Sequence, residues 1–564
     1  MAAAASSSSQ SSGIFIVCLS LSLLLIVGVI QLDNANQNGE PSAKLSQFLL
    51  RGNLPCQSVQ VSSVSKTSSR NTELPAHDET SEKIELLMEI WNSSPYLKED
   101  AKVSEEELSS ITRPPHLENC KARYMEYTRM DSRSDDGERP HWSLWKGLLG
   151  AELGKHVPYE DDGEELLLNK TALLQGPFPP WIDGGEEDNL PYTRRVQRDL
   201  WLHQHPKNCR DSSLKFLYVD FANISTWGTG AQLNAISGMV AVAMNENRVL
   251  VLEYFNRADH EGCKGSGHSR WTCYFIPETS KECRERALEL AASQEARKNK
   301  TITDMSNYWG GITWFAPIPV IWGKPWEHLQ ATSQVNGELT VHHNQMHIWW
   351  WRAQAIRYLT RYPSEYLCVL LNRARHEAFG RAAAALVVDT LPKEWPKVES
   401  SRRNITAMEK LVWSNHIHRP WVPRPLVSVH VRQGDKGREM KIFSFKSYME
   451  LAHNLRGRFP NAKHIWLSTE MQNVVDESKN YTKWNFYYTN IRRQTGSTTM
   501  KDYETGLGRW NSSTNAFVNL MMAVDCDYFI GALGSSWGSI IDGLRSTGGK
   551  ALAGIVSVNP GQFW

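Results

Sequence analysis

The 564-residue chain lacks an excess of either charge, because its 62 lysine and arginine residues balance 61 aspartate and glutamate residues. This balance removes any overall electrostatic reason to expect binding to nucleic acid or to an anionic membrane surface. The sequence also contains no Cys-x-x-Cys pair, and no histidines with zinc-site spacing lie near its cysteines, which argues against structural zinc. There is no internal repeat. Binding partners must therefore be sought in local clusters of side chains.

The first 32 residues carry no charged side chain. Within them, residues 13–32 form an apolar run that is long enough to span a bilayer. A cleaved signal peptide usually has a shorter apolar core and a basic start. The run therefore favours an uncleaved transmembrane signal-anchor, preceded by a short cytosolic tail at residues 1–12. A flexible stem rich in serine, asparagine and glutamine follows at residues 33–80.

Eight cysteines lie outside the apolar run, and an even number in a secretory protein fits disulfide bonds. Their connectivity cannot be deduced from the sequence. Seven Asn-x-Ser/Thr sequons agree with a luminal location.

A regular α/β pattern begins after an irregular N-terminal luminal extension at residues 81–210. The pattern starts with a strand over residues 215–221, a helix over 232–247 and a strand over 249–255, which form one βαβ unit. Gly228 and Gly230 lie in the connection that enters the helix. Such a loop brings backbone N–H groups to an anion at the helix end, or else serves only as a tight connection.

A second α/β pattern begins at Leu426 and predicts a Rossmann-like nucleotide-binding domain. Helical spacing also marks residues 348–362 and 365–379, which precede it. The expected strands cover residues 426–431, 464–469, 485–489, 527–533 and 551–558. The expected helices cover residues 445–456, 471–479, 514–524 and 536–545. We therefore expect an α/β protein with two Rossmann-like halves, at residues 211–425 and 426–564.

The most informative stretch of the chain is Leu426–Lys436. Its apolar half predicts a buried parallel strand, and His430, Arg432, Asp435 and Lys436 follow at the carboxyl end, where ligands bind in open α/β sheets. Arginine and lysine beside a histidine suit a diphosphate. The alternative is a strand end capped by an Arg–Asp pair at the surface.

Gly534-Ser535-Ser536 ends another predicted strand and opens a helix. Hydroxyl and free N–H groups there form a phosphate cradle if the strand lies near Arg432. The alternative is an ordinary serine N-cap.

Two acidic features suggest catalytic chemistry. Asp525-Cys-Asp527 matches the Asp-x-Asp signature of metal-dependent sugar transferases, but it precedes a predicted strand, so we interpret it as a helix-to-strand connection and expect no metal. Glu439 lies three residues after Lys436 and suits a general base, with a surface glutamate as the alternative.

These motifs resemble the α1,6-fucosyltransferase group, in a superfamily with nodulation fucosyltransferases and protein O-fucosyltransferases. His430-Val-Arg432-Gln-Gly-Asp435-Lys436 is similar to the group's His-Val-Arg-Arg-x-Asp-Lys signature. The resemblance covers roughly residues 209–564 in order and extends through further segments. These are Trp227–Leu233, Arg248–Glu253, Trp349-Trp350, Tyr488–Asn490, Asp527–Ile530 and Ser535-Ser536.

The resemblance implies a GT-B-like fold and an inverting, metal-independent transferase that uses GDP-fucose as its donor and needs no cofactor. It implies that Arg432 contacts the diphosphate, that His430 lies by the nucleotide and that Ser535 and Ser536 contact phosphate. Glu439 matches the family's base after a one-residue gap, with Lys436 beside it as a proton relay.

The implied partners are the nucleotide sugar, a glycan or glycoprotein acceptor and, through residues 13–32, the membrane. Nucleic acid is not among them. The implied location is the Golgi membrane, with a single-pass type II topology.

Two positions depart from the family pattern. Gln433 replaces a second arginine, and Asn519 replaces an aspartate that contacts guanine. Three alternatives therefore stay open: a different sugar donor, a protein serine or threonine as acceptor, or a non-catalytic sugar-nucleotide-binding paralogue.

Overall fold

The structure of the chain is a computed structural model that describes residues 79–99, 114–131, 191–222, 228–308, 333–335, 338–340, 346–389, 391, 420–438, 440–496, 498–550 and 555–559. The expected membrane anchor, almost all of the stem and Glu439 lie outside these residues. No helix in the described ranges has both the length and the apolar character required to cross a bilayer.

The strands form two sheets that are parallel except for one hairpin. The smaller sheet has the order β2-β1-β3, and the larger has the order β5-β4-β10-β9-β6-β7-β8. The strands are β1 (Lys215–Asp220), β2 (Arg248–Tyr254), β3 (Ile302–Asp304), β4 (Ser333–Val335), β5 (Glu338–Thr340), β6 (Leu426–Val431), β7 (His464–Thr469), β8 (Asn485–Tyr487), β9 (Tyr528–Gly531) and β10 (Val556–Ser557).

The direction in which successive strands are added to the larger sheet reverses between β6 and β9. From β6 the chain proceeds outward through β7 and β8, and it then returns to β9 on the other side of β6. The crevice outside the carboxyl ends of two such strands is the usual ligand site in open α/β sheets. The fold therefore places the ends of β6 and β9 where a ligand would bind.

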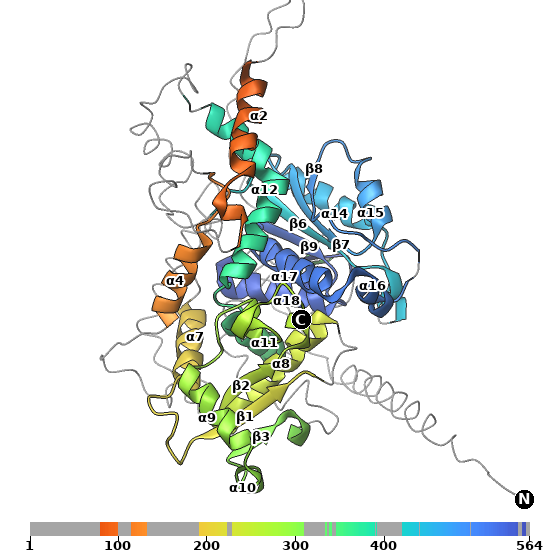
Figure 1. Cartoon of the computed structure of the whole chain (residues 1–564). Coiled ribbons are helices and arrows are strands. Elements are labelled where there is room, and N and C mark those ends of the chain that lie inside the picture. The colour runs from red at the N-terminus through yellow and green to blue at the C-terminus, as the bar shows by residue number, and fades with distance from the viewer. Residues whose placement is uncertain are drawn as a thin grey trace, which may run out of the picture. The chain divides into compact units, whose positions relative to one another are not determined.

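The helices connect and cover these strands (Figure 1). They are α2 (Glu79–Asn92), α4 (Cys120–Asp131), α7 (Pro191–Gln204), α8 (Thr229–Asn245), α9 (Lys281–Ala291), α10 (Gln294–Lys298), α11 (Met346–Leu359), α12 (Glu365–Val388), α14 (Phe445–Arg458), α15 (Gln472–Ser478), α16 (Met500–Leu507), α17 (Arg509–Asp525) and α18 (Ser536–Arg545).

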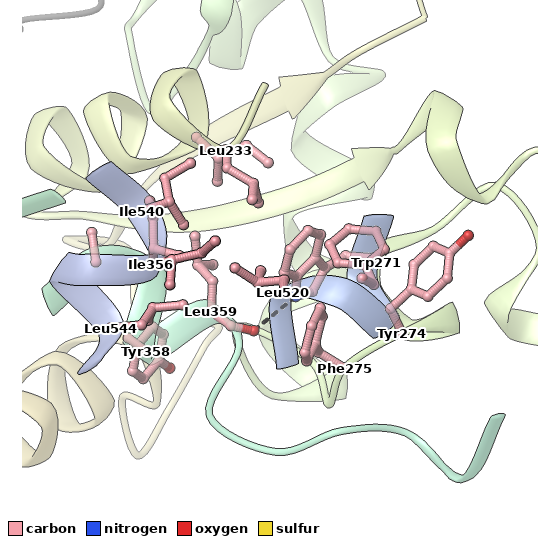
Figure 2. Packing of buried hydrophobic residues seen from close by; sticks show 14 of the residues in the cluster. Leu233, Trp271, Tyr274, Phe275, Ile356, Tyr358, Leu359, Leu520, Ile540 and Leu544 are labelled. Atoms are coloured by element: carbon pink, nitrogen blue, oxygen red, sulfur yellow. Dashed lines mark hydrogen bonds between the residues drawn. The ribbon is translucent and has the colours of Figure 1, made fainter. Parts of the chain in front are cut away.

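One apolar core joins helices from both parts of the chain. Figure 2 shows Leu233 of α8 and Ile356 of α11 gathered with Ile540 and Leu544 of α18. All four side chains are buried, and burying one such side chain contributes about 1.5–3 kcal/mol. Because α18 begins at the end of β9, this packing fixes the start of α18 relative to α8.

The N-terminal helices are part of the same packed body. Figure 1 shows α2 beside α12, and Leu87 and Trp91 of α2 are buried against Ala383 of α12. A disulfide bond joins Cys120, the first residue of α4, to Cys368 of α12 across 248 residues of sequence. Two further disulfide bonds are Cys209–Cys283 and Cys263–Cys273.

The α/β pattern predicted from the sequence is confirmed in most elements. Strands β6 and β7 and helix α18 have the predicted bounds, because continuous apolar runs and a Gly-Ser-Ser junction delimit them. Strand β9 and the described part of β10 are shorter than predicted, and α17 starts five residues earlier, at Arg509. The sequence pattern does not predict the β4–β5 hairpin or α16. The hairpin strands have three residues each, too few to show alternation.

The long-range disulfide bond yields a stability prediction. Cys120→Ser combined with Cys368→Ser should lower the free energy of unfolding by about 2–5 kcal/mol, because the bond restricts the unfolded chain. The matched control is Cys263→Ser with Cys273→Ser, whose bond spans only 10 residues and should cost less in the chain-entropy model. Urea denaturation of the three proteins measures both values. A larger loss in the control pair would contradict the expectation.

Candidate functional site

The end of β6 places a charged cluster at the carboxyl edge of the larger sheet. All six residues of β6 are buried, and Val431 pairs with Thr469 of β7. The next residues of the two strands, Arg432 and Glu470, therefore lie side by side. This adjacency follows from the parallel register, since carboxyl ends of neighbouring parallel strands lie at one edge of the sheet.

Arg432 is held by two carboxylates. Its Nη1 lies 2.5 Å from Glu470 Oε1, and its Nη2 lies 2.7 Å from Asp435 Oδ1. The Glu470 side chain is only 6% exposed, so this ion pair is largely removed from water. The Arg–Asp pair weighed as the alternative is thus present, and it lies at the predicted edge of the sheet.

The ion pairs perturb both partners of the Arg432–Asp435 contact. Burial acts to lower the pKa of Arg432, but the two carboxylates outweigh it and hold that pKa above its ordinary value. Burial acts to raise the pKa of Asp435, but the Met500 N–H and Arg432 hold it below its usual range. Both groups are therefore charged at neutral pH. The positive charge of Arg432 is balanced rather than exposed.

The loop after Arg432 depends on a glycine. Gly434 has a φ of +61°, and a Cβ built there would lie 3.2 Å from Gln494 Nε2 and 3.7 Å from Arg432 Nη1. Left-handed backbone and crowding together favour glycine at this position. Gln433 donates from its side chain to the Phe443 carbonyl at 2.9 Å. It therefore holds the loop and adds no charge.

His430 lies one pleat before Arg432, in the interior of the same face. It is 6% exposed, and its Nδ1 has no hydrogen-bond partner among the described residues. Burial, aided by the charge of Arg432, lowers the pKa of His430 to about 3, so the ring is neutral at physiological pH. A buried ring nitrogen without a partner is costly. A ligand group or water at this nitrogen would remove that cost.

Two helix N-termini meet beside this edge. A Cβ built on Gly230, in the first turn of α8, would lie 3.3 Å from Trp537 and 3.8 Å from Ser536 Cβ, at the start of α18. Gly228 is the N-cap of α8 and Ser535 the N-cap of α18, and neither helix receives a side-chain capping bond at that residue. Their first N–H groups therefore remain suited to an anion.

Asn519, predicted by resemblance to lie at the guanine, is buried in α17. Its Oδ1 accepts from Trp466 Nε1 at 3.1 Å and Ser468 Oγ at 2.8 Å. Its Nδ2 donates to the Asn515 carbonyl at 2.8 Å and to Asn515 Oδ1 at 2.9 Å. The indole N–H is a donor only, so it fixes the orientation of the amide. These four bonds use the full capacity of the Asn519 side chain.

Asp525 and Asp527 lie at the opposite, amino-terminal edge of the sheet. Arg424 pairs with Asp525 at 3.1 Å and with Asp527 at 2.5 Å, and Asp527 also accepts from the Leu426 N–H. Since α17 ends at Asp525 and β9 begins at Tyr528, the predicted helix-to-strand connection is confirmed. In the described part of the chain, no three His, Cys, Asp or Glu side chains cluster as metal ligands.

The two remaining predicted site residues are Lys436 and Glu439. Lys436 lies in the short 3-10 helix Gly434–Arg438 that follows Arg432. Glu439 lies outside the described residues, so its role as a base stays a prediction. Glu470 was missed by the sequence reasoning. It directly follows Thr469, the last residue of a predicted strand, and the rule that singled out Arg432 would have identified it.

Comparisons with known proteins give only a distant likeness. No family model and no curated protein matches the chain. The crystal structure of POFUT1 in complex with GDP-fucose is 13% identical, with a TM-score of 0.26, and the alignment covers 62% of this chain and 99% of that one. The apo form of POFUT1 is 12% identical, with a TM-score of 0.22, and covers 59% and 94%. These TM-scores do not establish a shared fold.

The Arg432–Glu470 pair yields a prediction that separates binding from stability. Arg432→Met should abolish GDP binding and also lower the free energy of unfolding by about 3–5 kcal/mol, because Glu470 is left buried without a cation. Adding Glu470→Gln should restore much of the stability but none of the binding. Calorimetric titration with GDP and urea denaturation measure the two effects.

The control for this cycle is Lys479→Met. Its pair with Asp476 is exposed and screened by solvent, so both readouts should stay near wild type. If Arg432→Met binds GDP like the wild type, Arg432 does not belong to the site.

A second prediction concerns Asn519. Asn519→Asp should lower the free energy of unfolding by about 1–3 kcal/mol and should not strengthen GDP binding, because a carboxylate would face the acceptor oxygens of Asn515. The exposed Asn490→Asp is the matched control. A stable Asn519→Asp protein with tighter GDP binding would assign Asn519 to the nucleobase after all.

Proposed function

We propose that the chain is an inverting glycosyltransferase that moves fucose from GDP-fucose to a hydroxyl of a glycan, in the manner of the α1,6-fucosyltransferases it resembles. One observation carries the proposal. Arg432 emerges at the point where the larger sheet reverses, and the starts of α8 and α18 meet beside that edge. A guanidinium and two sets of free N–H groups are the donors that a diphosphate leaving group requires.

The proposed reaction is a single displacement. The acceptor oxygen forms a bond to the anomeric carbon of fucose as the bond from that carbon to the diphosphate oxygen breaks, and GDP leaves with the electron pair. Arg432 and the helix N–H groups stabilise the negative charge that develops on the diphosphate. Glu439 takes the proton of the acceptor hydroxyl, with Lys436 beside it as a relay.

The carboxylates around Arg432 set a condition for donor binding. Arg432 already donates from Nη1 to Glu470 and to the Gln433 carbonyl, and from Nη2 to Asp435, so a diphosphate would use its remaining N–H groups or displace one of these acceptors. Because Asp435 is 32% exposed and Glu470 only 6%, we expect the diphosphate to displace Asp435 and leave the Glu470 pair in place. Glu470 would then orient the guanidinium during the reaction.

No metal is needed in this proposal, since cationic and N–H groups carry the leaving-group charge. We also propose a type II Golgi membrane protein anchored by residues 13–32.

A non-catalytic sugar-nucleotide-binding protein is the second candidate, favoured by the balanced charge of Arg432 and the neutral Gln433. Transfer to protein serine or threonine and use of another sugar donor remain alternatives for the substrate.

The test is transfer and donor hydrolysis by the full-length protein in detergent, with GDP-fucose and other nucleotide sugars and with glycan and glycoprotein acceptors. We expect turnover with GDP-fucose that survives EDTA. Glu439→Gln should reduce turnover by about 10² or more while GDP affinity stays near wild type, because glutamine cannot accept the proton. The exposed Glu450→Gln of α14 is the matched control.

The outcomes separate the candidates. Binding of GDP-fucose without turnover on any acceptor would favour the non-catalytic protein. Loss of activity in EDTA with recovery in Mn²⁺ would overturn metal independence. A wild-type rate in Glu439→Gln would remove Glu439 as the base.

A further inference from the structure

The segment after β8 runs back to the candidate site. The Gln494 N–H donates to the Glu470 carbonyl at 2.9 Å, and the Gln494 carbonyl accepts from the Gln472 N–H at 3.0 Å. These bonds attach Gln494 to the residues that follow β7, beside the partner of Arg432. Residues 493 and 494 therefore lie at the carboxyl edge, although neither the sequence pattern nor the family resemblance singles out these two residues.

Arg493 is a buried cation whose hydrogen-bond partners are carbonyl groups. It donates from Nε to Thr469, from Nη1 to Ile491 and from Nη2 to Thr489, at 3.2, 3.2 and 2.8 Å. The residue is 8% exposed and its guanidinium lies over the Tyr488 ring, 5.2 Å from the centroid. Among the described residues no carboxylate pairs with it. Burial lowers the pKa of Arg493 below its ordinary value, although two tyrosines act in the opposite direction.

The guanidinium keeps unused donors. Arginine has five N–H bonds, and three are used by the carbonyls of Thr469, Ile491 and Thr489. One N–H on each Nη atom is left without an acceptor in the part of the chain that the structure describes. N–H groups on the two neighbouring Nη nitrogens suit a ligand with two adjacent acceptor atoms.

Gln494 adds a second unsatisfied group. It is 5% exposed, and neither Nε2 nor Oε1 has a hydrogen-bond partner among the described residues. Its Nε2 lies 3.2 Å from where a Cβ on Gly434 would stand, a position that is also 3.7 Å from Glu470 Oε1. A buried amide with no partner is expensive unless a ligand or water satisfies it. The amide therefore points independently to an occupant at this edge.

Arg493 also adjoins the network around Asn519. Thr489 accepts from Arg493 through its carbonyl, and its hydroxyl oxygen lies 3.4 Å from Asn519 Nδ2. Asn519 has no hydrogen-bonding capacity left for a nucleobase, whereas Arg493 has two free N–H groups. Recognition of the base must then come from another residue, and Arg493 is joined to this network through Thr489 and has donors to offer.

We propose that Arg493, assisted by Gln494, reads the two-acceptor edge of a purine base, the O6 and N7 atoms of a guanine-type nucleotide. This inference rests on the proposed function, since it names the group that selects the donor's base. Bidentate contact between arginine and guanine O6 and N7 matches in geometry and charge. Adenine presents an amino group in place of O6, which would leave one Arg493 donor facing another donor. A purine with a 6-oxo group should therefore be selected over adenine.

The test measures affinities of GDP, IDP and ADP for the full-length protein by calorimetric titration. IDP keeps O6 and N7 but lacks the 2-amino group, so wild type should bind GDP and IDP similarly and ADP about tenfold to a hundredfold more weakly. Arg493→Met should weaken GDP and IDP by a similar factor and leave ADP nearly unchanged. Arg492→Met is the matched control, because the neighbouring Arg492 is exposed and donates to the Gly506 carbonyl.

Two further variants separate an effect on nucleotide recognition from a loss of folding. Arg493→Lys keeps the charge but not the paired donors, so it should retain the fold and still lose the preference for GDP over ADP. Gln494→Leu should leave ADP affinity unchanged and reduce GDP affinity severalfold. Thermal melting of each protein reports whether it is folded.

The result identifies which inference fails. Wild type that binds no GDP would overturn the proposed function itself. Wild type that prefers GDP over ADP, with the same preference in folded Arg493→Met or Arg493→Lys, would overturn the role of Arg493 and leave the proposed function standing.

Discussion

The parallel pairing of β6 with β7 on one side and β9 on the other is the constraint on which the candidate site depends. Because β6 is buried along its whole length, its register cannot slip without exposing apolar side chains. That register aligns the ends of the strands, so Arg432 and Glu470 become neighbours at one edge. The return of the chain to β9 brings the start of α18 to the same edge. The apolar strand that precedes each of these polar groups thus determines where that group lies.

Charge balance at this edge separates the groups that hold the site together from those that are available to a ligand. Arg432 forms ion pairs with Glu470 and Asp435, and the Asn519 amide is hydrogen-bonded to Trp466 and to neighbouring side chains. A ligand must either displace such a bond or use groups that have none. His430 Nδ1, which has no hydrogen-bond partner among the described residues, supplies one such group, and the helix starts supply others. Because burial makes a polar group without a partner costly, a ligand at these positions would remove an energetic cost of the fold.

The two parts of the chain also depend on each other for their shape. Helix α8 follows β1 in the smaller sheet, yet its Leu233 shares a core with Ile540 of α18, which follows β9 in the larger sheet. The close approach of Gly230 to Trp537 is a consequence of that shared core. A Cβ at Gly230 would require the Trp537 ring to give way by a few tenths of an ångström. Apolar packing therefore positions the two helix N-termini.

The sequence alone determined the α/β class, the bounds of β6, β7 and α18, and the placement of His430 and Arg432 at a strand end, because these follow from local apolar runs and from the rule that charges collect where buried strands stop. It could not determine which groups would meet there. The Arg432–Glu470 pair joins residues 38 apart, and the bonds that occupy Asn519 reach across 53 residues to Trp466. Whether the donors and acceptors of a side chain are already in use depends on contacts between residues that lie far apart in the sequence. Tertiary structure therefore decided that Asn519 is engaged and that Arg493 keeps N–H groups with no acceptor in the described part of the chain.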